Sequence, residues 1–260
     1  MLAACLPARL QVTAVLQDSS KLAGQLFWAE VGSVPCRKDG CCKQLFSFRY
    51  GTTDVLVFQQ IFRDHYLRAL YSLFPEDAAP KYILDAGANA GYATALFKLL
   101  WPDATVVSLE PDPSNFAQLR RNTAGFSGVH RLNAGLWGRQ ANITLSSNCG
   151  RGEEWGKDVA QMFNIPRFDF VKIDIEGAEG RVFVPGADLS WLGGPRVVSL
   201  EIHDFFAERF GMTAVSGHVD AAFAQHPNYQ IARDNEHVFF IDNEQLAAAN
   251  LAAKPGGGTP

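Results

Sequence analysis

A short glycine-containing turn in the first half of the sequence could form a ligand site. Residues 85–91 read DAGANAG and follow a β-rich run, so they open a helix at a strand end, where α/β sheets bind ligands. A dinucleotide site needs the spacing GxGxxG, but this turn has only Gly87 and Gly91, and the Asp85 carboxylate would repel a pyrophosphate. The turn is therefore compatible with a ligand that carries positive charge and no phosphate. The alternative is that Asn89 only caps the helix.

Two polar residues at later strand ends extend this prediction to a nucleoside. Glu110 ends the second β-rich run, and its two carboxylate oxygens could accept hydrogen bonds from both hydroxyls of a ribose. Asn133 ends the third run and could offer its amide to an adenine edge. A solvated acid at Glu110 and an ordinary polar turn at Asn133 are the alternatives. With the turn at 85–91, the pattern is compatible with S-adenosylmethionine, which combines a nucleoside with sulfonium and ammonium charges.

A group of acidic residues follows the fourth predicted strand. The segment 168–179 reads FDFVKIDIEGAE, so an apolar strand ends in a cluster that includes Asp174, Glu176 and Glu179. Glu176 and Glu179 have the i, i+3 spacing of one helix face, and favourable placement at a helix N-terminus is the structural alternative for both. Because the carboxyl ends of parallel strands carry the ligand sites of such sheets, we expect Asp174 and Glu176 to line a reaction site.

His203 follows the fifth predicted strand, in the sequence EIHD at residues 201–204. Imidazole has an ordinary pKa of about 6.5, so a histidine beside acids at this edge is a reasonable general base. We therefore expect His203, Asp174 and Glu176 to be the catalytic residues, with His203 as the leading candidate for the base and either acid as the alternative. A histidine that only hydrogen-bonds a loop remains the structural alternative.

These residues need a mostly parallel sheet to bring them to one edge. From about residue 82 onward, β-rich runs alternate with helical patterns, which is typical of successive βα units. Tyr92–Leu100 carries one apolar stripe able to cover a sheet face. The next helix is expected to have Asp112 as N-cap, Pro113 in its first turn and Gly125 in a left-handed conformation at its end. The predicted strands are Lys81–Asp85, Ala104–Glu110, Val129–Asn133, Phe168–Asp174, Arg196–Ile202, Tyr229–Ala232 and His237–Ile241.

The first 80 residues differ from this alternation. They contain a β-like run, Gln44–Tyr50, and a helical run with an apolar face, Asp54–Phe74. We expect residues 1–80 to form a cap packed on the sheet, which either helps to roof a ligand cleft or is only structural. Residues 81–246 would then form the Rossmann-like domain, and the Ala- and Gly-rich residues 247–260 a flexible tail.

The composition excludes several classes of protein. With 47% hydrophobic and 19% charged residues, the chain can bury a large core and is not disordered in bulk. Its net charge of −4, without a basic block, argues against a nucleic acid partner. Because Lys98 interrupts the most apolar helical run, we expect no membrane span. Residues 1–16 lack a basic region before their apolar part, which favours a soluble, cytoplasmic protein over a secretory one.

Metal and disulfide chemistry receive little support from the sequence. Asp174, Glu201 and Asp204 could bind Mg²⁺ through oxygen, but hard-cation sites are weakly specified by sequence, so no metal site is predicted. The five cysteines are an odd number in a chain too long to need disulfides, and reduced thiols are expected. A local disulfide stays open for the cluster Cys36, Cys41 and Cys42.

Four motifs taken together resemble the FkbM-type S-adenosylmethionine-dependent methyltransferases. They are DAGANAG at 85–91, EPDP at 110–113, KIDIEGAE at 172–179 and EIH at 201–203. The resemblance covers roughly residues 54–241 and implies a class I methyltransferase fold, an α/β doubly wound, mostly parallel seven-stranded sheet with an antiparallel final hairpin. It also implies O-methylation, often of a sugar or natural-product hydroxyl. By position, Asp85, Gly87, Asn89, Gly91 and Glu110 match cofactor-binding positions, while Asp174 and His203 match the acceptor side.

The first hypothesis for function is thus an S-adenosylmethionine-dependent methyltransferase acting on a hydroxyl of a small molecule or sugar. The fourth strand ends in Asp174-Ile175-Glu176 and not in the Asn-Pro-Pro-aromatic run of enzymes that methylate base amino groups, which favours oxygen as the acceptor. The alternatives are a non-catalytic nucleoside-binding or scaffold protein on the same fold and, less favoured because a glycine is missing, an NAD-dependent oxidoreductase.

Overall fold

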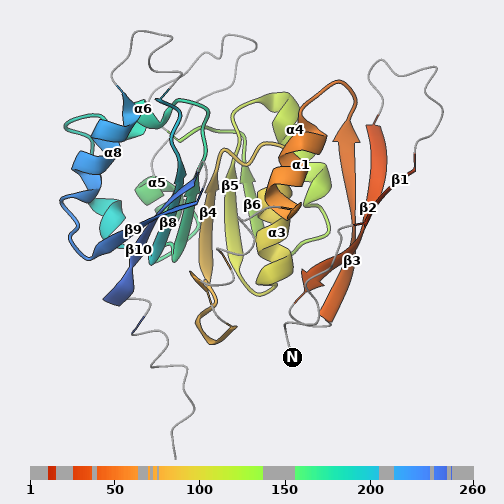
Figure 1. Ribbon diagram of the computed structural model, residues 1–260, viewed down its shortest axis with the longest axis horizontal. Helices are drawn as coiled ribbons and strands as arrows, with labels where there is room; N and C mark the ends of the chain where they lie inside the picture. Colours follow the sequence, from red (N-terminus) through yellow and green to blue (C-terminus); the bar gives the residue numbers. More distant parts are fainter. Residues whose placement is uncertain are drawn as a thin grey trace, which may run out of the picture.

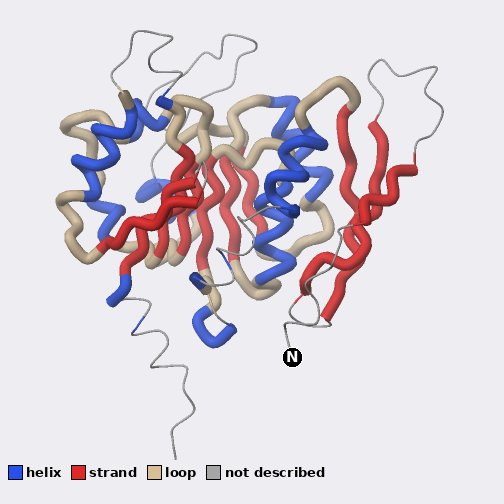
Figure 2. The backbone as a smooth tube through the Cα atoms, in the orientation of Figure 1, coloured by secondary structure: helices blue, strands red, loops and turns tan. Residues whose placement is uncertain are grey.

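The computed structural model describes residues 11–15, 26–36, 40–63, 70, 73, 74, 76–136, 156–204, 214–234, 237–244 and 247. Their main feature is a seven-stranded sheet with helices on both sides, beside a smaller sheet of three strands (Figures 1 and 2). The predicted tail lies outside the described residues, apart from residue 247. The strands of the large sheet are β4 (Tyr82–Ala86), β5 (Thr105–Leu109), β6 (Val129–Leu132), β7 (Phe170–Ile173), β8 (Val197–Glu201), β9 (Tyr229–Asp234) and β10 (His237–Asp242).

The order of strands in this sheet is β6-β5-β4-β7-β8-β10-β9. The first five strands in this order pair in parallel, and β10 runs antiparallel to both of its neighbours, β8 and β9. The chain leaves β4 toward β5 and β6 on one side and later continues from β7 toward β8 on the other. The order therefore reverses between β4 and β7. All seven predicted strands and the antiparallel final hairpin are confirmed.

The two faces of the sheet are covered by different helices. One face packs against α3 (Tyr92–Leu100), and the other packs against α5 (Gly156–Met162), α6 (Glu179–Val182) and α8 (Val215–Phe223). Neighbouring residues of each strand alternate between these cores, as Ile83 and Leu84 do in β4. This alternation requires both faces to be apolar, which explains the continuous hydrophobic runs of the parallel strands. The 3₁₀ turns are η3 (Glu76–Ala78) and η4 (Ser190–Gly193).

Helix α4 (Pro113–Asn122) begins as predicted but ends differently. The Asp112 side chain accepts a hydrogen bond from the Asn115 backbone N–H at 2.8 Å, so it is the N-cap, and Pro113 occupies the first turn. The predicted left-handed Gly125 is wrong, because the helix already ends at Thr123 and Gly125 does not have a positive φ. The Thr123 hydroxyl donates to the Leu119 carbonyl at 2.6 Å, which satisfies a carbonyl at the helix end.

The N-terminal cap is a three-stranded antiparallel sheet followed by a helix, labelled β1 (Gln11–Val15), β2 (Leu26–Cys36), β3 (Gly40–Arg49) and α1 (Asp54–Arg63). The three strands and α1 pack mainly on α3 and α4 (Figure 1), and Phe74, at the end of the predicted helical run, contacts Phe170 of β7 in the large sheet. The rest of the predicted helical run to Phe74 falls partly outside the described residues. Aromatic rings join the cap to α3 in one buried cluster of Phe46, Phe48, Phe58, Phe62 and Tyr92.

A buried polar network joins the cap to α4. The Asn122 side-chain oxygen accepts hydrogen bonds from the Ser47 backbone N–H and hydroxyl at 2.9 and 3.0 Å, and its amide donates to the Ala90 carbonyl at 2.9 Å. The side chains of Ser47 and Asn122 are at most 2% exposed. Since buried polar groups need partners, this network fixes how the cap sits on the helices.

Replacement of Asn122 by leucine tests this network. We expect Asn122→Leu to lower the free energy of unfolding by about 2–4 kcal/mol, because the shape is nearly kept while two Ser47 donors lose their acceptor. Urea denaturation measures the change. Arg121→Ala, an exposed position on the same helix, is the matched control and should change stability by less than about 0.5 kcal/mol. Equal effects of the two variants would contradict the assigned role of Asn122.

Candidate functional site

The loops that follow β4 and β7 meet where the strand order reverses. Gly87, just after β4, has a left-handed φ of 79°, and a Cβ placed there would lie 1.7 Å from the Asp174 carbonyl oxygen. The Gly87 backbone N–H donates to the Leu109 carbonyl at the end of β5, at 3.0 Å. Only glycine allows this approach of two backbones. The reversal point of such a sheet is where ligands bind, so the loops at 87–91 and 174–178 border the candidate site.

The turn at 87–91 is shaped by backbone conformations that side chains rarely adopt. Asn89 has a φ of 49° and Gly91 a φ of 86°. Gly91 is the N-cap residue of α3, so the alternative that Asn89 caps the helix is wrong. The Asn89 backbone N–H instead donates to the Glu110 carboxylate at 2.8 Å. A Cβ at Gly91 would lie 2.8 Å from a Leu119 methyl group, so this glycine lets α4 pack against the turn.

Glu110 links the turns that follow β4 and β5. Its carboxylate accepts the backbone N–H groups of Asn89 and Asp112, each at 2.8 Å, and the residue is 5% exposed. A carboxylate can accept about four hydrogen bonds, so acceptor capacity remains beyond these two backbone donors and the Asn115 side chain. Burial raises the pKa of Glu110, although these backbone hydrogen bonds act in the opposite direction. Asn133 is exposed beside it, and its amide nitrogen donates to the Glu110 and Pro111 carbonyls at 2.8 and 3.0 Å.

Asp85 is placed differently from what its strand-end position suggested. Its side chain is fully buried and accepts a hydrogen bond from the Thr94 hydroxyl at 2.6 Å, and its other oxygen lies 3.5 Å from the Lys172 Nζ. A ligand cation therefore has no exposed carboxylate surface to contact at Asp85 in this conformation. The residue acts on the site indirectly, by balancing the charge of Lys172 and by holding the start of α3 through Thr94.

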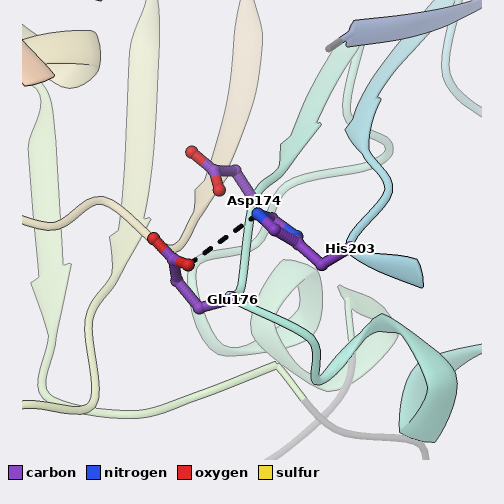
Figure 3. Close-up of side chains that lie close together, drawn as sticks. All are labelled: Asp174, Glu176 and His203. Atoms are coloured by element: carbon purple, nitrogen blue, oxygen red, sulfur yellow. Dashed lines mark ion pairs between the residues drawn. The ribbon is translucent and has the colours of Figure 1, made fainter. Parts of the chain in front are cut away.

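The second half of the site is formed by charged side chains after β7 and β8. Asp174, Glu176 and His203 lie close together (Figure 3). One carboxylate oxygen from each acid and one imidazole nitrogen of the histidine lie within 4.8 Å of one another. Glu176 has a left-handed φ of 54°, and its side chain is 72% exposed, whereas that of Asp174 is 26% exposed. The structure thus brings together the three residues predicted to be catalytic.

His203 is held by carboxylates on both ring nitrogens. Its Nδ1 lies 3.0 Å from Glu179 Oε1, and its Nε2 lies 3.4 Å from Glu201 Oε1 and 3.8 Å from Glu176 Oε2. Burial lowers the pKa of His203, but the hydrogen bonds to Glu179 and Glu201 and their charges raise it to about 10. The ring therefore carries a proton near neutral pH in this arrangement. This differs from the neutral imidazole base expected from the ordinary pKa of histidine.

Two acids of this region have structural roles that the sequence left open. Glu179 is fully buried in the first turn of α6, and its carboxylate accepts the Ile175 backbone N–H at 3.1 Å as well as contacting His203. It is thus a buried partner of the histidine and not a surface acid at a helix end. The Asp204 side chain accepts the Ser216 backbone N–H at 2.9 Å, in the first turn of α8.

Lys172 is a residue of the site that the predictions missed. It is 3% exposed, and its Nζ lies 3.1 Å from Asp174 Oδ2 and 3.2 Å from the Gly87 carbonyl oxygen, to which it donates. It therefore connects Asp85, the turn after β4 and the acids after β7. A signal was present in the sequence, because a lysine within the apolar strand Phe170–Ile173 has to be paired when it is buried.

The strand order, with β10 antiparallel between β8 and β9, is that of the class I methyltransferase fold. Comparison with known families agrees, since residues 157–239 match the family model described as the methyltransferase FkbM domain. This segment contains the motifs at 172–179 and 201–203, while those at 85–91 and 110–113 precede it. The chain is thus similar to FkbM-type methyltransferases, the family that the four motifs resemble.

Three curated proteins illustrate this similarity. Methyltransferase 1 of Beauveria bassiana is 25% identical over 157 residues, which cover 45% of this chain and 62% of that protein. Methyltransferase sdnD of Sordaria araneosa is 32% identical over 93 residues, covering 35% and 34%. The 31-O-demethyl-FK506 methyltransferase FkbM of Streptomyces tacrolimicus is 28% identical over 199 residues, covering 57% and 74%. The chain thus spans less than two thirds of the length of the first two relatives.

Solved structures show a more distant likeness. An O-methyltransferase from Bacillus cereus in complex with SAH has a TM-score of 0.42 at 16% identity, covering 68% of this chain and 79% of that one. A methyltransferase from Geobacter sulfurreducens has a TM-score of 0.41 at 15% identity, covering 75% and 90%. The fold assignment depends on the strand order and not on these scores. Among the described helices, none has the length and apolar character needed to cross a bilayer.

Proposed function

We propose that the protein is an S-adenosylmethionine-dependent methyltransferase that methylates a hydroxyl oxygen of a small molecule or sugar. The observation that carries the proposal is that two groups of residues, here called half-sites, meet at one edge of the sheet. Residues suited to a nucleoside follow β4 and β5, and a cluster of ionisable residues follows β7 and β8. The halves touch where Gly87 approaches the Asp174 carbonyl. A donor and an acceptor bound in these halves would be neighbours.

The residues after β4, β5 and β6 fit the nucleoside part of the donor. Glu110 keeps acceptor positions for the ribose hydroxyls after binding two backbone N–H groups. Asn89 and Asn133 lie beside it, and Asn133 would face the adenine. Gly87 and Gly91 keep the turn in the backbone conformation that this arrangement needs. The bound donor would supply a methyl group already activated by its positive sulfonium.

The residues after β7 and β8 would bind and deprotonate the acceptor. The donor, when bound, would supply the methyl group to the hydroxyl oxygen, and its sulfur would keep the electron pair of the broken carbon–sulfur bond. The hydroxyl proton passes to a carboxylate of the acidic cluster, of which Glu176 is the most exposed described member. Asp174 and His203 complete the predicted catalytic set. The printed name of the Streptomyces tacrolimicus relative, a 31-O-demethyl-FK506 methyltransferase, supports oxygen as the acceptor atom.

Two measurements test the proposal. Calorimetric titration should show binding of S-adenosylmethionine and of its demethylated product, but not of NAD. Incubation with an isotope-labelled methyl donor and a mixed pool of sugar and natural-product hydroxyl compounds, read by mass, should then reveal a methylated acceptor. Binding without turnover of any hydroxyl compound would favour the non-catalytic alternative, and NAD binding would favour an oxidoreductase.

Glu110→Gln tests the assignment of the ribose-binding residue. We expect the variant to bind S-adenosylmethionine more weakly by about 1.5–3 kcal/mol, the range for a lost hydrogen bond to a charged group. The amide NH₂ of glutamine cannot accept a hydrogen bond, so one of the two backbone N–H groups would lose its acceptor in the variant. Thermal unfolding without ligand measures how much this loss destabilises the fold. Glu244→Gln, an exposed position, is the control and should bind normally. Unchanged calorimetric affinity of Glu110→Gln would exclude this role.

A further inference from the structure

The cluster of Asp174, Glu176 and His203 has the composition and spacing of a cation site. A ligand-type atom from each residue lies within 4.8 Å of the other two (Figure 3). Nitrogen and oxygen ligands lie about 2.0–2.2 Å from a bound first-row metal ion, so three of them around one ion are about 3–4 Å apart. The three side chains would therefore have to close by about 1 Å, a movement that the exposed Glu176 side chain can largely supply.

The orientation of His203 is a second, independent observation. Its ring is 7% exposed, and Nδ1 is held 3.0 Å from the buried Glu179 carboxylate. This leaves Nε2 directed toward Glu176 and Glu201, at 3.8 and 3.4 Å. Histidines that bind metals characteristically use their other ring nitrogen for a hydrogen bond to a carboxylate, which fixes the ring and its tautomer. Glu179 has this relation to His203 without belonging to the three converging residues. An ion bound at Nε2 would displace the proton that this nitrogen carries near neutral pH, and the proton would pass to solvent.

The charges around the cluster also favour a cation. Four carboxylates surround the histidine, from Asp174, Glu176, Glu179 and Glu201, and the described lysine beside them, Lys172, contacts Asp174 at 3.1 Å. Glu179 Oε2 is buried and has no hydrogen-bond partner among the described residues. Buried carboxylate charge is costly unless it is balanced, so a further positive charge at this place would stabilise the arrangement.

We propose that Asp174, Glu176 and His203 bind a divalent first-row metal ion, with Mn²⁺ as the best-suited probe. Two carboxylates and one imidazole form a mixed set that suits Mn²⁺, whereas Mg²⁺ prefers oxygen ligands. Three protein ligands leave coordination positions open on the side of the acceptor. With Glu176 bound to the ion, the acceptor hydroxyl proton would pass instead to the neighbouring Glu201 carboxylate, and the ion would favour its loss. This role rests on the proposed methyltransferase function. Binding of the ion itself does not.

The test is a titration of the full chain with Mn²⁺, followed by electron paramagnetic resonance of the free ion, without methyl donor or acceptor. We expect one saturable site per chain, with affinity lowered at least about 100-fold in Glu176→Gln and in His203→Gln. If His203→Gln does not fold, Glu176→Gln still tests the site, because the Glu176 side chain is 72% exposed and its replacement should leave the fold intact. Asp220→Asn, an exposed acid on α8, is the matched control and should bind Mn²⁺ as the unmodified chain does.

Two results would overturn the metal site. One is the absence of saturable binding up to about 1 mM Mn²⁺, the weak end of functional cation sites. The other is equal affinity in Glu176→Gln and Asp220→Asn. Because the resonance signal needs no methyl transfer, saturable Mn²⁺ binding without turnover of any acceptor would contradict only the proposed function. Turnover that persists without any Mn²⁺ binding would contradict only the metal site.

Discussion

Gly87→Ala is expected to lower the free energy of unfolding by about 4 kcal/mol or more, a loss that single substitutions rarely cause. The new Cβ would lie 1.7 Å from the Asp174 carbonyl oxygen and 2.7 Å from its carbon, so the loops after β4 and β7 would have to separate. Urea denaturation measures the loss. Calorimetry with S-adenosylmethionine, on whatever folded protein remains, should show no binding, because both half-sites border this contact.

Gly186 provides a matched control for backbone strain. It has nearly the same left-handed φ, 83° against 79° for Gly87, but a Cβ there would meet nothing within 4 Å. Gly186→Ala should therefore cost only the conformational strain, about 1–2 kcal/mol. The difference between the two variants isolates the steric conflict with Asp174. If Gly87→Ala cost no more than Gly186→Ala, the close contact of the two loops would be refuted.

Lys172→Met is expected to lower the free energy of unfolding by about 3–5 kcal/mol, because it removes a buried cation and leaves its partner charges uncompensated. Lys172 contacts Asp174 at 3.1 Å and Asp85 at 3.5 Å, and the Asp85 side chain is fully buried. Methionine fills a volume similar to that of lysine, so the loss of stability measures the removal of the charge more than a change in packing. Chemical denaturation near neutral pH is the measurement.

Lys98 offers a second buried lysine for comparison. It is also 3% exposed, but its Nζ donates to the backbone carbonyls of Pro102 and Ala104 and not to carboxylates. Lys98→Met leaves these two carbonyls without their donor and removes the attraction between the ammonium charge and Asp103, and it should cost about 1–3 kcal/mol. The double variant Asp85→Asn/Lys172→Met should recover part of the loss, since neither member of that pair remains charged. A Lys172→Met effect no larger than that of Lys98→Met would show that the ion pairs are weak.

The elements of the large sheet were predictable because their signals are local. Several of its strands are short runs rich in β-branched or aromatic residues, bounded by polar or glycine-containing turns, as Thr105–Leu109 is. Tyr92–Leu100 matched the observed helix at both ends. Gly125 was misassigned because glycine after a helix is only a tendency, and the Thr123 hydroxyl satisfies a final carbonyl instead.

The position of the cap was not predictable from such signals. The apolar stripe of α3 predicted one buried face, but every residue of this helix is buried, including Lys98. One face packs on the sheet and the other is covered by α1 and β2 of the cap. An amphipathic pattern shows that a helix has an apolar side but does not show which distant segment covers the rest. The contact between Ser47 and Asn122 joins residues 75 positions apart, so local sequence patterns do not predict it either.

For the site, the sequence by itself determined which ionisable residues lie at which strand ends, because strand ends are set by local patterns and the parallel order follows from the alternation of strands and helices. Only the tertiary structure decided how these residues are paired. The approach of Gly87 to Asp174 requires β4 and β7 to be neighbours, although some 85 residues separate them. The pairing of His203 with Glu179 requires the ends of β7 and β8 to adjoin. Burial lowers the pKa of this imidazole, but Glu179 and Glu201 together raise it to about 10. Burial and the distance between charges determine the protonation state of a side chain, and both depend on three-dimensional packing that residue spacing does not contain.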